Sequence, residues 1–287
     1  MASNDPQDNA LDITDRLLWR ANRMQPATVT EKAQKQLAGV EDGDVCAEFN
    51  ALQAFTLTDG VLTTDTYQTE TGFGVRAIND TARGLAHSSQ FSHRRLDDAF
   101  RDAKAQVQDS GNSGKRDLDD LHCGHAHSLY RADNPLDGVP DSEKIRLLQD
   151  VDAYIREHNP NVTQVNASLS MNWQALQIIR PDGTRFADIR PMVKLKVLPI
   201  LNRQYPGMGF FGGRFDATRL LDESVWQQTC DRALQEAYYL SQARDIEGGE
   251  MPVVLNNGLC GVLIHEAVGH ALEADLVRTG SSVYSDF

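Results

Sequence analysis

Hydrophobic and polar residues follow two different periods in the first third of the chain. Apolar residues at helical spacing predict a helix over residues 13–24 and a second over residues 30–38, which ends at Gly39. A few residues later, apolar residues occur at every second position and lead to Asp59-Gly60, a dipeptide typical of hairpin turns. Further strands are predicted over residues 61–69, 73–78 and 84–87, followed by a helix over residues 96–107.

The second part of the chain again combines helices with strands. A helix is predicted over residues 141–158, strands over residues 162–168, 173–179 and 185–201, a long helix over residues 222–244 and a short buried strand over residues 251–255. The tract PGMGFFGG at residues 206–213 lacks the GxGxxG spacing and the following helix of a nucleotide site, so we interpret it as a structural bend. The whole pattern predicts an α+β fold, in which an N-terminal helix–β-meander–helix domain precedes a mixed β-sheet unit with long helices.

Composition and charge narrow the class of protein. With 40% hydrophobic and 24% charged residues, the 287-residue chain has the composition of a globular protein. The net charge of −13 argues against direct binding of nucleic acid, and no apolar run is long enough to span a membrane. The N-terminus is acidic and polar, unlike a secretory signal, and Cys46, Cys123, Cys230 and Cys260 form no CxxC pair. We therefore expect a cytoplasmic protein with reduced thiols.

The segment GLCGVLIHEAVGHALEAD, residues 258–275, carries the candidate chemistry. A His-Glu pair followed about one turn later by a second His is the way metallopeptidases place two metal ligands and a base on one helix. Neutral imidazoles suit zinc, and the adjacent carboxylate can accept a proton from water whose pKa the metal has lowered. The pattern predicts His265 and His270 as metal ligands and Glu266 as the catalytic base.

The spacing of this motif departs from the usual HExxH. His265 and His270 stand at i and i+5, which is roughly 140° apart on a regular helix instead of about 40°. Three explanations remain open: the two histidines are unrelated, a π-bulge brings them together, or the helix breaks near Gly269. We predict a local distortion around Val268 and Gly269, because a regular helix there would count against a shared metal.

Several neighbouring residues are weaker candidates. Glu273 follows His270 by three residues, so it is predicted to hold this histidine in position or to join the metal. Asp275 is a weaker candidate for the same role. Cys260 stands near the start of the same helix and is interpreted as a core residue. The cluster His122, Cys123, His125 and His127 has metal-like spacing, but we favour a polar surface loop.

The sequence also resembles a known family. HEAVGHALEAD is similar to the signature of the TldD/PmbA metallopeptidases, first described as modulators of DNA gyrase. DGDVCAEF resembles the first strand of that family, TGFGVRAINDTARGLAHSSQFS its most recognisable N-terminal stretch and LDDAFRDAKA the helix that follows. The resemblance covers the chain from about Val40 to its end, and the HExxxH segment is its most specific part.

This resemblance implies a TldD-like catalytic subunit, since the PmbA-like (TldE) relatives generally lack the metal motif. It implies zinc held by His265 and His270, with Glu266 as the general base. Such proteins form dimers, either of like subunits or with a PmbA/TldE-like subunit, and they cleave unfolded peptides. In the family a cysteine from a C-terminal domain is the third zinc ligand; this chain ends at Phe287, so the resemblance implies a truncated or inactive form.

These interpretations divide the chain into five parts. They are an N-terminal helical segment (1–39), an N-terminal α+β domain (40–110), a linker (111–140) that begins in the polar stretch QDSGNSGKRD, a central α+β domain (141–250) and the start of the catalytic domain (251–287). Two functions are consistent with this organisation. The first is a zinc peptidase acting on flexible peptides, and the alternative is a noncatalytic subunit that binds a partner or a peptide.

Overall fold

The computed structural model describes residues 6–79, 82–107 and 131–285. The chain divides into two compact units, unit 1 (Met1–Ala243) and unit 2 (Arg244–Phe287), and each is described by itself. None of the described helices combines the length and the apolar character that a membrane span requires.

The first part of unit 1 combines short helices with three strands. The helical elements are α1 (Pro6–Thr14), the π-helical η1 (Asp15–Trp19), the 3-10 turn η2 (Arg20–Asn22), α2 (Pro26–Gln36) and α3 (His93–Ala105). The strands are β1 (Asp42–Thr58), β2 (Val61–Asn79) and β3 (Ala82–Ser88). Asp59 and Gly60, both with positive φ, turn the chain from β1 into β2, as the Asp-Gly pair predicts.

The second part of unit 1 begins with a long helix. Its elements are α4 (Asp141–His158), β4 (Val162–Ile179), β5 (Arg185–Leu201), β6 (Tyr205–Pro206), β7 (Gly209–Gly213), the 3-10 helix η3 (Ala217–Leu221) and α5 (Glu223–Gln242). The predicted helix over residues 141–158 has the bounds of α4. Most of the predicted linker, residues 111–140, lies outside the described residues, and residues 131–140 contain no helix or strand.

Some strands are longer than the hydrophobic pattern predicts, although the strand predicted over residues 185–201 has the bounds of β5. Two strands were expected over residues 61–69 and 73–78, but β2 is one strand of 19 residues. Its polar middle stays in the ladder because residues 69–72 pair with residues 48–51 of β1. In the same way, the two strands predicted over residues 162–179 form the single strand β4. Pairing along a continuous neighbour therefore outweighs a local interruption of the pattern.

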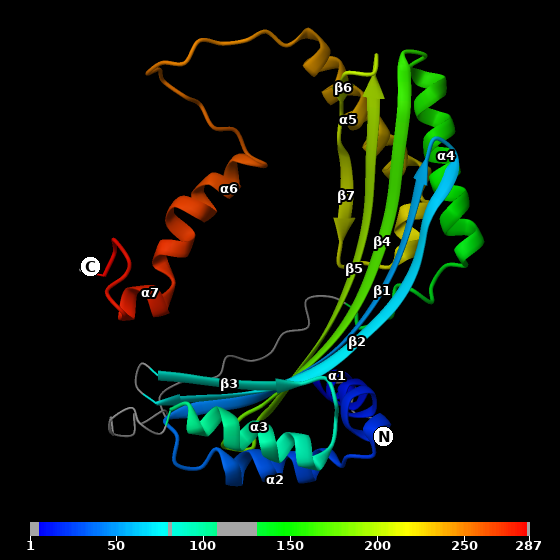
Figure 1. Cartoon of the computed structure of the whole chain (residues 1–287). Helices are drawn as coiled ribbons and strands as arrows, with labels where there is room; N and C mark the ends of the chain where they lie inside the picture. Colours follow the sequence, from blue (N-terminus) through cyan, green and yellow to red (C-terminus); the bar gives the residue numbers. More distant parts are fainter. Residues whose placement is uncertain (1–5, 80–81, 108–130, 286–287) are drawn as a thin grey trace. The chain divides into compact units, whose positions relative to one another are not determined.

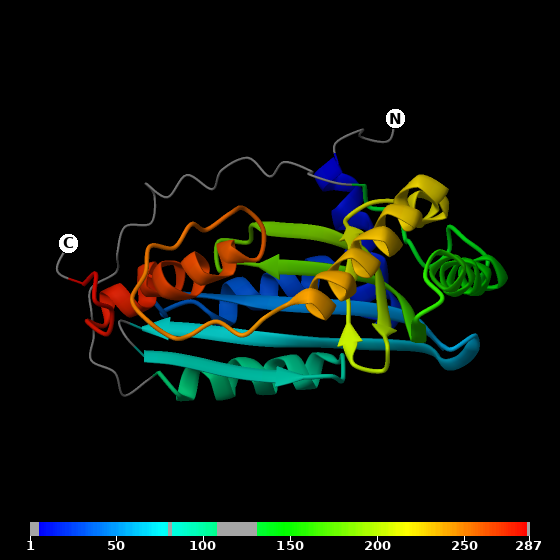
Figure 2. The same cartoon turned by 90° about the horizontal axis from the view of Figure 1, so that it is seen from above.

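All described strands belong to one antiparallel sheet. Its order is β3-β2-β1-β4-β5-β6, with β7 also paired to β5, and Figure 2 shows the long strands side by side in this order. β1 pairs with β4 from Val45↔Ile179 to Thr58↔Asn166, so the sheet runs through both of the α+β domains predicted from the sequence. This pairing could not be predicted, because the hydrophobic pattern of a strand does not identify its pairing partner.

The helices of unit 1 pack on one face of this sheet. The core residues of β1 are odd-numbered. Helices α2 and α3 cover the end of the strand that contains Val45, and α4 and α5 cover the end that contains Phe55 (Figure 1). Even-numbered residues of β1, such as Cys46, Glu48 and Asn50, are only partly buried. They point to the opposite face because side chains alternate along a strand. We call this second face the open face.

The buried side-chain amide of Gln177 links the N-terminal helices to the sheet by hydrogen bonds. Gln177 of β4 accepts a hydrogen bond from Trp19 Nε1 at 2.6 Å and donates to Thr14 Oγ1 and Asp15 Oδ1 at 2.8 and 2.9 Å. Because a buried polar group without partners destabilises a fold, this match selects one position for η1 on β4.

The glycine-rich tract lies against α5. A Cβ atom on Gly207 would stand 1.9 Å from Ala233 O, and one on Gly209 would stand 2.1 Å from Thr229 O. Only glycine permits the backbone to approach the helix so closely. The contacts agree with the interpretation of this tract as a structural bend.

Unit 2 is largely helical. It contains α6 (Cys260–Ile264), the π-helical η4 (His265–Gly269), the 3-10 turn η5 (His270–Leu272) and α7 (Ala274–Arg278). The buried strand predicted over residues 251–255 is wrong, since this segment forms no strand and Val254 is 95% exposed. A strand requires a neighbouring ladder, and no described strand pairs with this segment.

Candidate metal centre

The HExxxH motif lies where α6 passes into a π-helical turn. In η4 the N–H of His270 donates to His265 O, the i to i+5 bond that defines a π-turn. The predicted distortion around Val268 and Gly269 is therefore present. Gly269 itself keeps helical angles, with φ −58° and ψ −53°, so the helix widens here and does not break. Of the three explanations for the i, i+5 spacing, the π-bulge is the one that the structure contains.

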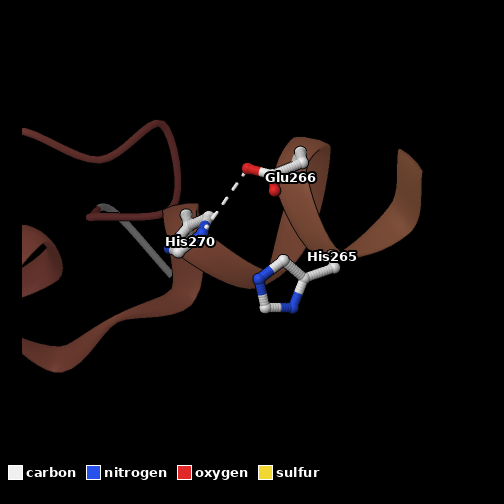
Figure 3. A group of neighbouring side chains, drawn as sticks. All are labelled: His265, Glu266 and His270. Carbon is white, nitrogen blue, oxygen red and sulfur yellow. Dashed lines mark ion pairs between the residues drawn. The ribbon is translucent and has the colours of Figure 1, made fainter. Parts of the chain in front are cut away.

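The widened turn brings the three predicted side chains together (Figure 3). The ring centroids of His265 and His270 are 4.7 Å apart and the rings are nearly perpendicular. His270 Nε2 is 3.5 Å from Glu266 Oε2, a pair that the i, i+4 spacing could have predicted but that we did not anticipate. One ligand atom from each residue lies within 4.8 Å of the others. Two ligands of a tetrahedral zinc are about 3.3 Å apart, a separation inside this 4.8 Å limit.

Glu273 holds the other nitrogen of His270. His270 Nδ1 is 2.5 Å from Glu273 Oε1, and this hydrogen bond, assisted by the charges of Glu273 and Glu266, raises the pKa of His270. A carboxylate on Nδ1 fixes the proton there and leaves Nε2 as the free lone pair. Nε2 is also the nitrogen that lies near Glu266.

The group of close ligand atoms does not include Asp275 or Cys260. Asp275 is the second residue of α7, and its carboxylate accepts a hydrogen bond from Leu276 N at 3.0 Å. Cys260 is exposed, contrary to the expectation of a core residue, because the described residues supply no packing partner for the start of α6. The cluster of residues 122–127 lies outside the described residues.

The group is open to solvent. Half of the His270 side chain and 61% of the Glu266 side chain are exposed. Within the part of the chain that the structure describes, His265, Glu266 and His270 are the one set of His, Cys, Asp or Glu residues close enough to share a metal ion. Zinc accepts the two imidazoles as ligands, and the carboxylate beside them can act as a ligand or as a base.

Two family models match the second half of the chain. Residues 134–238 match the PmbA/TldA metallopeptidase central domain, and residues 248–287 match the PmbA/TldA metallopeptidase C-terminal domain. The chain belongs to the PmbA/TldD family. The resemblance found in HEAVGHALEAD is thereby confirmed, and the motif lies inside the matched C-terminal segment.

Curated members of the PmbA/TldD family are similar over most of the chain. A metalloprotease TldD homolog of Haemophilus influenzae is 31% identical over 255 residues, which cover 86% of this chain and 52% of that protein. A second, from Buchnera aphidicola, is 29% identical over 253 residues, covering 85% of this chain and 52% of that protein. The chain thus spans about half the length of the curated relatives it matches.

A solved structure supports the fold. A protein from Bacteroides thetaiotaomicron, described as a proposed modulator of DNA gyrase, superposes with a TM-score of 0.58 at 13% identity. The superposition covers 73% of this chain and 49% of that protein. The expected α+β class is therefore correct, with one curled antiparallel sheet as its centre.

Proposed function

We propose that this chain is the metal-binding part of a zinc-dependent peptidase that hydrolyses peptide bonds by metal-activated water. The main support for this proposal is the π-turn at His265–Gly269, because it brings the rings of His265 and His270 close together, whereas a regular helix would hold them apart. Membership of a metallopeptidase family also supports this proposal.

The residues of the group have distinct proposed roles. His265 and His270 hold the zinc ion, His270 through the Nε2 that Glu273 leaves free. When bound, zinc acts as a Lewis acid for hydrolysis of the amide. Glu266 has 61% of its side chain exposed and its Oε2 lies 3.5 Å from His270 Nε2, so it would accept the proton of the attacking water and return it to the leaving amine.

A third protein ligand completes most catalytic zinc sites. The family resemblance implies a cysteine of the C-terminal domain as this ligand, and Asp275 is a weaker candidate for holding a ligand in position. We further propose flexible or unfolded peptides as substrates and a dimer with a like or a PmbA/TldE-like subunit as the assembly.

Zinc content and peptide cleavage test the two roles separately. We expect elemental mass spectrometry of the purified protein to find about one zinc ion per chain. His265→Ala is expected to lose the zinc, whereas Glu266→Gln is expected to keep it and to lose peptide hydrolysis by at least about 100-fold.

His93→Ala is the matched control, since His93 is an exposed histidine at the start of α3. It should change neither zinc content nor cleavage. Loss of zinc from Glu266→Gln would make this residue a ligand and not a base. A chain that stays free of zinc in zinc-containing buffer, with or without His265, would refute the proposal.

A further inference from the structure

The loop that follows α7 is bonded to the turn that contains His270. In this loop Ser282 donates a hydrogen bond from its Oγ to Ala271 O, the carbonyl of the residue after His270. The two partners are 11 positions apart in the chain, so the bond belongs to no single helix. It links the loop after α7 to the 3-10 turn η5, which begins at His270.

This bond closes the end of the metal-site helix. The last carbonyl groups of a helix have no amide donor inside the helix and take partners from elsewhere. Glu273 leaves the helical region with ψ 131°, and its N–H donates to His270 O at 3.2 Å. The next carbonyl, that of Ala271, accepts from Ser282 Oγ. The hydroxyl therefore acts as a C-terminal cap that a separate loop supplies.

The backbone of the loop holds Ser282 in place. Gly280 has φ 71° after the end of α7, and Ser281 N donates to Leu276 O at 3.0 Å. This combination is a Schellman motif, which reverses the chain at a helix end. Tyr284 N then donates to Ser282 Oγ at 3.0 Å. Because the hydroxyl accepts one hydrogen bond and donates another, its direction toward η5 is fixed.

Glu273 lies at the corner between η5 and α7. Its N–H bonds to η5, and its C=O accepts from Val277 N of α7 at 3.1 Å. The bond from Ser282 to Ala271 spans this corner, so it fixes the angle between the two elements. Half of the Glu273 side chain is exposed, so the backbone of the corner, more than side-chain packing, sets the position of its carboxylate.

We propose that Ser282 is a positioning residue for the metal centre. By bonding to Ala271 O it keeps the carboxylate of Glu273 on Nδ1 of His270. The proton of the neutral imidazole then stays on Nδ1, and Nε2 remains free for the metal. The inference rests on the proposed zinc site, but the effect of Ser282 on the pair of His270 and Glu273 needs no metal.

Competition with a chelator measures the zinc affinity of each variant. Ser282→Ala is expected to bind zinc about three- to tenfold more weakly, the effect of losing one hydrogen bond. Ser282→Thr keeps the hydroxyl and should stay within about twofold of the wild type. Ser281→Ala is the matched control, because this neighbouring hydroxyl bonds to Thr279 Oγ1 within the loop. It should bind zinc like the wild type.

Two further measurements separate positioning from a general loss of stability. Glu273→Ala removes the carboxylate through which Ser282 acts, so adding Ser282→Ala to it should not weaken zinc binding further. Nitrogen-15 NMR of the zinc-free protein at about pH 9, well above the ordinary histidine pKa of about 6.5, locates the imidazole proton of His270. We expect this proton on Nδ1 in the wild type and on both nitrogens in Ser282→Ala. Circular dichroism checks that each variant is folded.

Several results would overturn the proposal. They are an unchanged zinc affinity of folded Ser282→Ala, a Ser282→Thr protein that binds as weakly as Ser282→Ala, and additive losses when Ser282→Ala is combined with Glu273→Ala. A wild-type protein that binds no zinc would instead refute the zinc site. In that case the imidazole proton decides the role of Ser282 alone, and an unchanged position of this proton in Ser282→Ala would refute it.

Discussion

Replacing Gly209 by alanine should destabilise unit 1 because the added methyl group has no room. The new Cβ would stand 2.1 Å from Thr229 O and 3.1 Å from Ala233 Cβ, both on α5. Gly209 does not have positive φ, so backbone strain plays no part in this expectation. Without the clash, the substitution would stabilise the protein by about 0.4–1 kcal/mol through the unfolded state.

The size of the effect follows from the overlap. Ordinary contact begins at 3.4 Å, so β7 and α5 must separate by about 1.3 Å at this point. Such overpacking costs about 1–3 kcal/mol, and we expect the upper part of this range because the obstructing atom belongs to the helix backbone. A loss of about 3 kcal/mol corresponds to a melting temperature lower by roughly 6–12 °C for a domain of this size.

Thermal unfolding followed by circular dichroism measures the difference. Gly248→Ala is the control, since no atom lies within 4 Å of its Cβ position, and it should change stability by less than about 0.5 kcal/mol. Adding Ala233→Gly to Gly209→Ala should not restore stability, because Thr229 O remains in place. A Gly209→Ala protein that melts at the wild-type temperature would refute the close approach of β7 to α5.

Two further substitutions test other parts of the structure. The ammonium group of Lys144, 2% exposed, donates to three acceptors, so Lys144→Met should lower the unfolding free energy at pH 7 by about 2–4 kcal/mol in urea titrations. The hydrogen bond from Lys144 lowers the pKa of Asp141, so this pair stabilises the folded state above the ordinary aspartate pKa of about 3.9 and ceases to do so as the pH falls through the lower folded pKa. The stability difference between the wild type and Lys144→Met should therefore shrink below about pH 4. A difference that stays constant with pH would contradict this. Glu273→Gln should weaken zinc binding about 10- to 100-fold in competition with a chelator, because His270 loses its carboxylate partner, and an unchanged affinity would exclude this role.

Local features were predictable where neighbouring residues decide them. The helix over residues 141–158 and the turn at Asp59-Gly60 follow from hydrophobic period and turn chemistry, and both are present. The distortion of the metal-site helix was also predictable, since the i, i+5 spacing of His265 and His270 is incompatible with convergence on a regular helix. The sequence could not choose between a π-turn and a break, because Gly269 permits both.

Non-local pairing decided the rest. The sequence by itself determined the period of each segment, the residues of the HExxxH motif and the family resemblance, all of which depend on residues close together along the chain. Only the tertiary structure decided that β1 pairs with β4, that residues 251–255 form no strand and that Glu48 and Glu70 share a hollow with His87. The physical reason is that a strand is completed by hydrogen bonds to a distant segment, and many registers satisfy the same alternation of polar and apolar residues.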